Sequence, residues 1–273
     1  MVEIASKSDD ALMPHRESVQ DMFATFRQEL DARHDLFEKV VKISRDVTVE
    51  SKRMIFHLHR VVGNVEEKQA WLSQAEEKKN AILKKLEQVA LLLRNEDPLQ
   101  FARSYSPGLQ EFIEALALLR FLREVDDVAV AHMNQTVLSI NSMRNMLTFS
   151  NQGDEITLPV PVGEFLLGLA DVSGEAMRMC INSSANALGC RDLSSSLPWK
   201  LCEFVRILHD AFVIFTDLTD PGSPKRKSLS EKTRTMLANL KKCEDVCYTL
   251  AIRGQEMHKD VLKTTLLESS GTM

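Results

Sequence analysis

The stretch FRQELDARHDLFEKVVKISRDVTVESKRMIFHLHR, residues 26–60, contains neither glycine nor proline, and neither occurs anywhere between Pro14 and Gly63. Its apolar residues recur at helical spacing, as at Phe37 and Val40. This pattern predicts a single long helix. Because such a helix exceeds the usual length of helices in globular proteins, we expect its ends to pack against other subunits.

Glycine and proline divide the rest of the chain into further helical stretches. The predicted helices span residues 65–95, 109–152, 162–187, 199–215 and 230–267. Strand signals are nearly absent, so the sequence predicts an all-α fold, a bundle of about six to seven long, roughly antiparallel helices. We expect a flexible N-terminal segment at residues 1–18 and a single helical domain over 19–268, with an exposed loop at about 217–229.

The composition is that of an ordinary globular protein. The chain has 273 residues, enough to bury a full core, and 44% of them are hydrophobic. A net charge of −5 argues against holding nucleic acid by the overall field, although a local basic strip or a basic partner could still do so. Five cysteines without a C-x-x-C pair indicate a reducing compartment, and Cys243 and Cys247 lack the nearby histidines that would complete a zinc site.

The sequence also indicates where the protein resides. No apolar run approaches the ~20 residues that a membrane span requires, and the first residues lack the basic and apolar regions of a signal peptide. We therefore expect a cytoplasmic protein that makes no use of a membrane. The short basic cluster Lys225-Arg226-Lys227 is a candidate signal for an additional nuclear pool.

Two pairs of acidic residues lie in stretches that are otherwise almost wholly apolar. Glu111 and Glu114 lie in LQEFIEALALLRFL, residues 109–122, and Asp171 and Glu175 lie in FLLGLADVSGEAMRMCIN, residues 165–182. Each pair is spaced so that both acids share one side of a helix. Carboxylates are rarely buried without a partner, which suggests a cation between the two pairs.

Two plainer interpretations stay open from periodicity alone. Glu111 and Glu114 could form a solvated strip, and Arg178, on the same strip as Glu175, could neutralise that acid in a structural ion pair. If the two faces meet instead, a set of oxygen ligands suits Mg²⁺ or Mn²⁺, which can activate water and stabilise the charge on a phosphate under attack. A di-iron site would require histidine three residues after the acids, and none of these positions holds one.

Three segments resemble the translin family: residues 26–60, GLQEFIEA at 108–115 and LLGLADVSGEAMRMCIN at 166–182. The likeness extends from about residue 20 to 265. It implies a translin-like bundle of long helices that assembles with translin into a closed hetero-octameric shell. It also implies Mg²⁺-dependent endoribonuclease activity on single-stranded RNA, such as the nicked passenger strand during activation of the RNA-silencing complex.

By this resemblance, the family's acidic motifs place Glu111, Glu114, Asp171 and Glu175 in catalytic and metal-binding roles, with Glu114 and Glu175 as the direct ligands. The hypothesis is therefore a catalytic subunit that uses Mg²⁺, with Mn²⁺ as an alternative. The competing hypothesis is a non-catalytic adaptor that stabilises translin and binds other proteins.

Basic residues are the candidates for contact with RNA phosphates. Residues 39–60 carry a local surplus of positive charge, although a solvated helix flank would look the same. No motif for stacking on bases is recognisable, so we expect RNA to be handled through its backbone rather than read by sequence. The candidate RNA-binding residues are Arg45, Lys52, Arg53 and Arg178.

Overall fold

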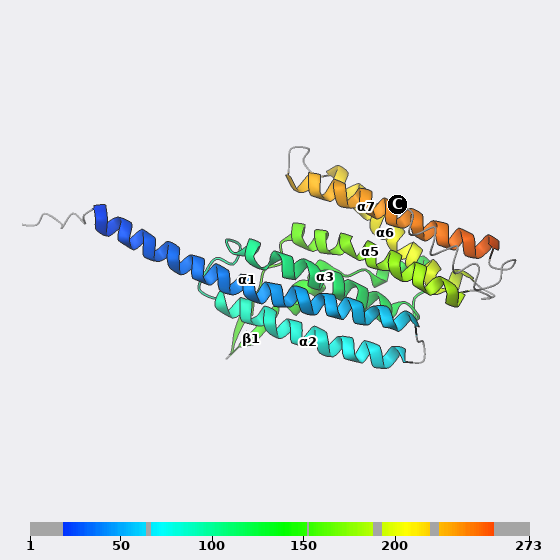
Figure 1. The fold of residues 1–273 in the computed structure, drawn as a ribbon, viewed down its shortest axis with the longest axis horizontal. Helices are drawn as coiled ribbons and strands as arrows, with labels where there is room; N and C mark the ends of the chain where they lie inside the picture. The colour runs from blue at the N-terminus through cyan, green and yellow to red at the C-terminus, as the bar shows by residue number, and fades with distance from the viewer. Residues whose placement is uncertain (1–18, 64–66, 152, 188–192, 219–223, 254–273) are drawn as a thin grey trace, which may run out of the picture.

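The computed structural model describes residues 19–63, 67–151, 153–187, 193–218 and 224–253 (Figure 1). These residues form seven α-helices, two 3₁₀ segments and a small hairpin, which confirms the predicted all-α bundle. The long helices are α1 (Val19–Gly63), α2 (Lys68–Leu92), α3 (Ala102–Glu124), α5 (Val162–Ala187), α6 (Leu197–Leu218) and α7 (Pro224–Arg253). The segment predicted to be flexible, residues 1–18, lies outside the described residues.

The helices lie side by side in an order that differs from their order in the sequence (Figure 1). Helix α1 packs against α2 and α3, α3 against α5, and α5 against the α6–α7 pair. The middle helix α3 is buried on almost every side, including the run Ala115–Leu119. Its nearly all-round apolar sequence thus reflects a central position. No helix among the described residues combines the length and apolar content needed to cross a membrane.

The N-terminal part of α1 extends away from the rest of the bundle (Figure 1). Every residue from 19 to 35 is exposed, including the large apolar side chains Phe23 and Leu30. Further along, α1 enters the core, where Val40, Val47 and Met54 are completely buried.

Two glycines set the spacing of the three central helices. A Cβ atom on Gly108 of α3 would lie 2.6 Å from the Ser44 carbonyl oxygen of α1. A Cβ on Gly168 of α5 would lie 2.7 Å from the Gln110 carbonyl oxygen of α3. Both distances are shorter than any real Cβ contact, so only glycine allows α1, α3 and α5 to approach this closely.

The predicted third helix, 109–152, is wrong at both ends. Helix α3 begins before Pro107 and runs through it, and nearby the Ser44 hydroxyl accepts a hydrogen bond from the Gly108 amide, 3.1 Å. It ends at Glu124, although the sequence holds no glycine or proline there. The chain continues through a 3₁₀ segment (Val130–Thr136), α4 (Ile140–Met146) and the antiparallel strands β1 (Thr148–Asn151) and β2 (Asp154–Thr157).

The connection between α6 and α7 is shorter than the loop predicted at about 217–229. Helix α6 reaches Leu218 and α7 begins at Pro224, which leaves residues 219–223, outside the described residues, to join them. Proline is well suited to the first position of a helix, where its missing N–H would have no partner in any case. Pro224 therefore starts a helix, where the sequence suggested a loop.

Candidate active site

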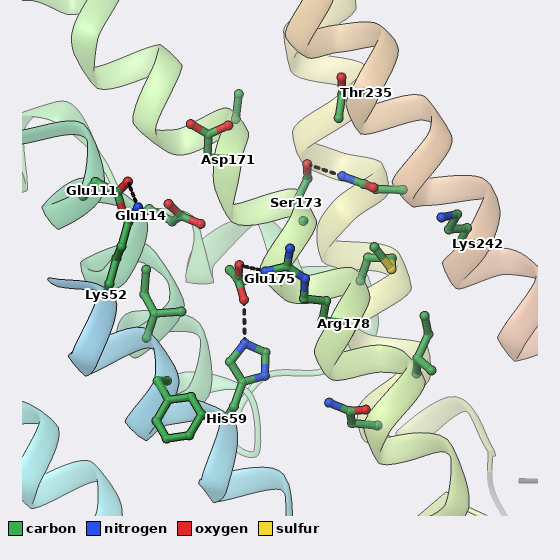
Figure 2. A pocket seen from close by; sticks show the side chains of 18 of the residues that line it. Lys52, His59, Glu111, Glu114, Asp171, Ser173, Glu175, Arg178, Thr235 and Lys242 are labelled. Carbon is green, nitrogen blue, oxygen red and sulfur yellow. Dashed lines mark hydrogen bonds and ion pairs between the residues drawn. The ribbon is translucent and has the colours of Figure 1, made fainter. Parts of the chain in front are cut away.

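An open pocket of about 1040 Å³ lies between α1, α3, α5 and α7, and all four predicted acids line it (Figure 2). Helices α1 and α7 also supply basic side chains to its walls. The charged residues and aromatic residues that line it are Lys52, Phe56, His59, Glu111, Glu114, Asp171, Glu175, Arg178, Lys232 and Lys242.

The pairing of the acids follows from the close packing of α3 and α5. Gly168 lies against Gln110, one residue before Glu111. Asp171 follows Gly168 by three residues, and Glu175 follows one turn later on the same face. The glycine contact therefore presents the acids of α5 to those of α3.

Among the acids of the pocket, Glu114 has the pKa that departs most from its ordinary value. Burial of its carboxyl group, reinforced by the negative charges of Asp171, Glu111 and Glu175, raises its pKa to about 8. The nearby Lys232 ammonium opposes this shift without cancelling it. Among the described residues no basic side chain forms an ion pair with Glu114, so at neutral pH its carboxyl group holds a proton. A cation placed beside it would release that proton.

The other three acids each contact a basic side chain. Figure 2 shows the contacts of Glu111 and Glu175. The Lys52 Nζ atom lies 3.2 Å from Glu111 Oε1. Lys232 of α7 forms an ion pair with Asp171. Each pairing brings a positive charge from another helix to the acids.

Glu175 has two such partners. His59 Nε2 lies 2.7 Å from Glu175 Oε2, and Arg178 forms an ion pair with the other carboxylate oxygen. Burial tends to raise the pKa of Glu175, but the His59 hydrogen bond and the Arg178 charge outweigh it and place this pKa below its ordinary value. Glu175 is therefore ionised where Glu114 is protonated, and two neighbouring glutamates differ in state because of their partners.

The donor chemistry of the pocket suits a hard cation. Its four carboxyl groups offer only oxygen ligands, and among the described residues no basic side chain forms an ion pair with Glu114. Within the described part of the chain, no three acidic, histidine or cysteine side chains are already arranged around a common metal position. The other three acids already form pairs with lysine, arginine or histidine. The acidic side chains would therefore have to turn toward an ion for it to be bound.

The four candidate RNA-binding residues divide into two groups. Lys52 and Arg178 line the pocket, with 63% and 64% of their side chains exposed. Arg45 is exposed outside the pocket, and Arg53 forms an ion pair with Glu50, 2.7 Å, on another face of α1.

Sequence reasoning missed His59, Lys232 and Lys242. His59 follows Lys52 by seven residues, two helical turns, which is a signal that both occupy one face of α1. That this face meets α5 depends on the packing of helices distant in sequence. The same holds for Lys232 and Lys242, which α7 brings to the pocket from the far end of the chain.

Comparison with known proteins gives a consistent result. Residues 35–254 match the Translin family. The chain is 37% identical over 248 residues to translin-associated protein X of Mus musculus, covering 88% of this chain and 81% of that protein. It is 26% identical over 240 residues to the translin-associated protein X homolog of Schizosaccharomyces pombe, covering 86% and 89%.

Proposed function

The chain belongs to the translin family, and we propose that it is the catalytic subunit of a Mg²⁺-dependent endoribonuclease formed with translin. The observation that carries this proposal is the convergence of Glu111, Glu114, Asp171 and Glu175 on one pocket. A structural role gives no reason to gather four partly buried acids in one pocket, since mutual repulsion costs free energy unless a cation compensates it.

The proposed cofactor is Mg²⁺, with Mn²⁺ as an alternative. Glu114 and Glu175 would hold the ion, and Glu111 and Asp171 would complete its environment directly or through water. When bound, such an ion activates water and stabilises the charge that develops on a phosphate under attack.

The remaining side chains of the pocket support this chemistry. His59 acts as a positioning residue, because its hydrogen bond fixes one oxygen of Glu175 and keeps that acid ionised. An acid that is not bound to the ion can accept the proton of the attacking water. The exposed cations Lys52 and Arg178 can contact the phosphates on either side of the bond that is cleaved.

The proposed substrate is single-stranded RNA, such as the nicked passenger strand in the activation of the RNA-silencing complex. An open pocket lined by acids and by exposed cations fits a flexible backbone. The net charge of −5 favours local contacts over attraction by the whole surface.

The proposed partner is translin, in a hetero-octamer located in the cytoplasm. Relatives of this chain carry the name translin-associated protein X. The apolar side chains on the exposed part of α1 fit a surface that another subunit covers. These side chains are Val19, Met22, Phe23, Phe26 and Leu30.

The same surface favours the alternative function, an adaptor that stabilises translin and binds other proteins without cleaving RNA. The two functions use different parts of the chain, since the apolar side chains of α1 lie outside the pocket. They therefore predict different effects for substitutions in the pocket.

Replacing Asp171 with asparagine tests the proposal. In the full chain co-expressed with translin, we expect Asp171→Asn to lower the rate of Mg²⁺-dependent cleavage of a single-stranded RNA about hundredfold or more, because a charge that stabilises the ion is removed. Glu124→Gln is the matched control, since Glu124 lies on α3 outside the pocket and should leave the rate unchanged. Full cleavage by Asp171→Asn, with the mass of the complex intact, would favour the adaptor.

The pKa of Glu114 predicts that metal binding is linked to proton release. Below pH 8 this carboxyl group must lose a proton before it can bind an ion, whereas Glu175 is already ionised. We expect the affinity for Mn²⁺ to rise about tenfold per pH unit between pH 6 and 8 and to level off above pH 8. Titration calorimetry at pH 7 in buffers of different ionisation enthalpy should show about one proton released per site. A pH-independent affinity would contradict this.

A further inference from the structure

One wall of the pocket carries an aromatic side chain that the proposed chemistry does not use. Phe56 lines the pocket with 66% of its surface exposed. Lys52, Phe56 and His59 are spaced four and three residues apart, which places them on one face of α1. Along that face, the ring lies between the partner of Glu111 and the partner of Glu175.

The ring is held in place from one direction. The Arg60 guanidinium carbon lies 5.3 Å from the centre of the Phe56 ring and 5.5 Å from the centre of the Trp71 ring system. Both are distances at which a cation and an aromatic ring attract each other. Trp71 packs against the hydrophobic core, so the guanidinium connects Phe56 to an anchored side chain.

This arrangement differs from an isolated surface phenylalanine, which is common and needs no explanation. Phe56 lies inside a pocket, is oriented by a guanidinium group and still exposes most of its surface. Aromatic rings combined with nearby cations bind single-stranded nucleic acid, because every base has a face that can stack. Lys52, one turn away and 63% exposed, carries the ammonium group that would contact the adjoining phosphate.

We propose that Phe56 stacks on an unpaired base of the RNA strand whose phosphate faces the four acids. This inference rests on the proposed function and assigns a base-binding subsite to the same pocket. Stacking is tolerant of sequence, so it adds binding without base-specific reading. It selects single strands, because in a duplex both faces of a base are covered by its neighbours.

The test measures binding of a short oligouridine by the full chain co-expressed with translin, in EDTA so that no cation supports cleavage. We expect Phe56→Ala and Phe56→Leu to weaken binding roughly ten- to hundredfold, and Phe56→Trp to preserve it. Tyr248→Ala is the matched control, since Tyr248 is 67% exposed on α7 outside the pocket, and it should bind normally.

A second probe separates stacking from other roles of the ring. An oligouridine with one abasic position is moved step by step along the strand. At one position we expect wild-type binding to fall to the level of Phe56→Leu, and Phe56→Leu to lose nothing further.

Three results would overturn the inference. The first is normal binding of oligouridine by Phe56→Leu, and the second is a failure of that variant to assemble with translin. The third is that an abasic position weakens binding by Phe56→Leu to the same extent wherever it lies in the strand. None of them depends on the acids. If Phe56→Leu binds normally while Asp171→Asn abolishes cleavage, the base subsite fails and the proposed nuclease stands. If RNA is cleaved in EDTA, the metal-dependent nuclease itself fails.

Discussion

Replacing Glu114 with glutamine is expected to lower RNA cleavage by the complex with translin roughly 10²- to 10⁴-fold. Glutamine has nearly the same shape as glutamic acid but cannot ionise to bind a cation. The measurement is the initial rate of single-stranded RNA cleavage at saturating Mg²⁺. Glu124→Gln, on the same helix and outside the pocket, should cleave at the wild-type rate.

The same substitution should stabilise the protein at high pH. The pKa of Glu114 rises from an ordinary 4.5 to about 8, so its protonated form is favoured in the folded state. The resulting contribution to the free energy of unfolding is fully present below pH 4.5 and is lost as the pH rises to 8 and beyond. It amounts to at most about 5 kcal/mol. Glutamine stays neutral and avoids this loss.

Thermal unfolding of the complex in EDTA, at one protein concentration, checks this expectation. Glu114→Gln should melt several degrees above the wild type at pH 8.5 and close to it at pH 5. A variant that cleaves RNA normally, or that is less stable than the wild type at pH 8.5, would contradict the assigned state of Glu114.

Replacing Gly168 with alanine is expected to separate α3 from α5. The new methyl group would lie 2.7 Å from the Gln110 carbonyl oxygen and 3.0 Å from Ile113 Cβ, and neither neighbour is the end of a flexible side chain. Such overpacking costs roughly 1–3 kcal/mol, which exceeds the gain of up to about 1 kcal/mol from a better helix former. Because the acids must meet across this contact, cleavage should also fall about hundredfold.

Gly174 provides the matched control on the same helix. A Cβ atom there would meet nothing nearer than Asn239 Nδ2, at 3.9 Å. Gly174→Ala should therefore raise the free energy of unfolding by up to about 1 kcal/mol, while Gly168→Ala lowers it. Equal effects of the two substitutions on the melting temperature would show that Gly168 does not set the spacing between α3 and α5.

Sequence periodicity predicted the helices whose ends coincide with glycine or proline. The predicted helix 162–187 matches α5, which follows a proline-rich loop. Periodicity failed where a helix ends without glycine or proline, or continues through a proline. Pro107 lies within α3, and the helix ends at Glu124 without a breaker. The β1–β2 hairpin was missed, although β-prone residues flank a turn in which Gly153 adopts a φ of +93°.

The four acids could be selected from the sequence because carboxyl groups are conspicuous on apolar helices. Their different states could not be. Glu114 and Glu175 differ because Glu175 accepts a hydrogen bond from His59, a residue more than a hundred positions away. Likewise, Phe56 could not be selected, because the sequence carries no recognisable stacking motif. The exposure of this ring in the pocket depends on how α1 packs.

We propose that these acids bind the cation that RNA cleavage requires. The measurement that tests this binding is the cleavage rate of the complex as a function of Mg²⁺ concentration, for the wild type and for Glu175→Gln. We predict no wild-type cleavage in EDTA, saturable activation by Mg²⁺, and for Glu175→Gln a half-saturating concentration at least tenfold higher or no activity at all. Wild-type cleavage that persists in EDTA, or the same Mg²⁺ dependence in both proteins, would contradict the claim.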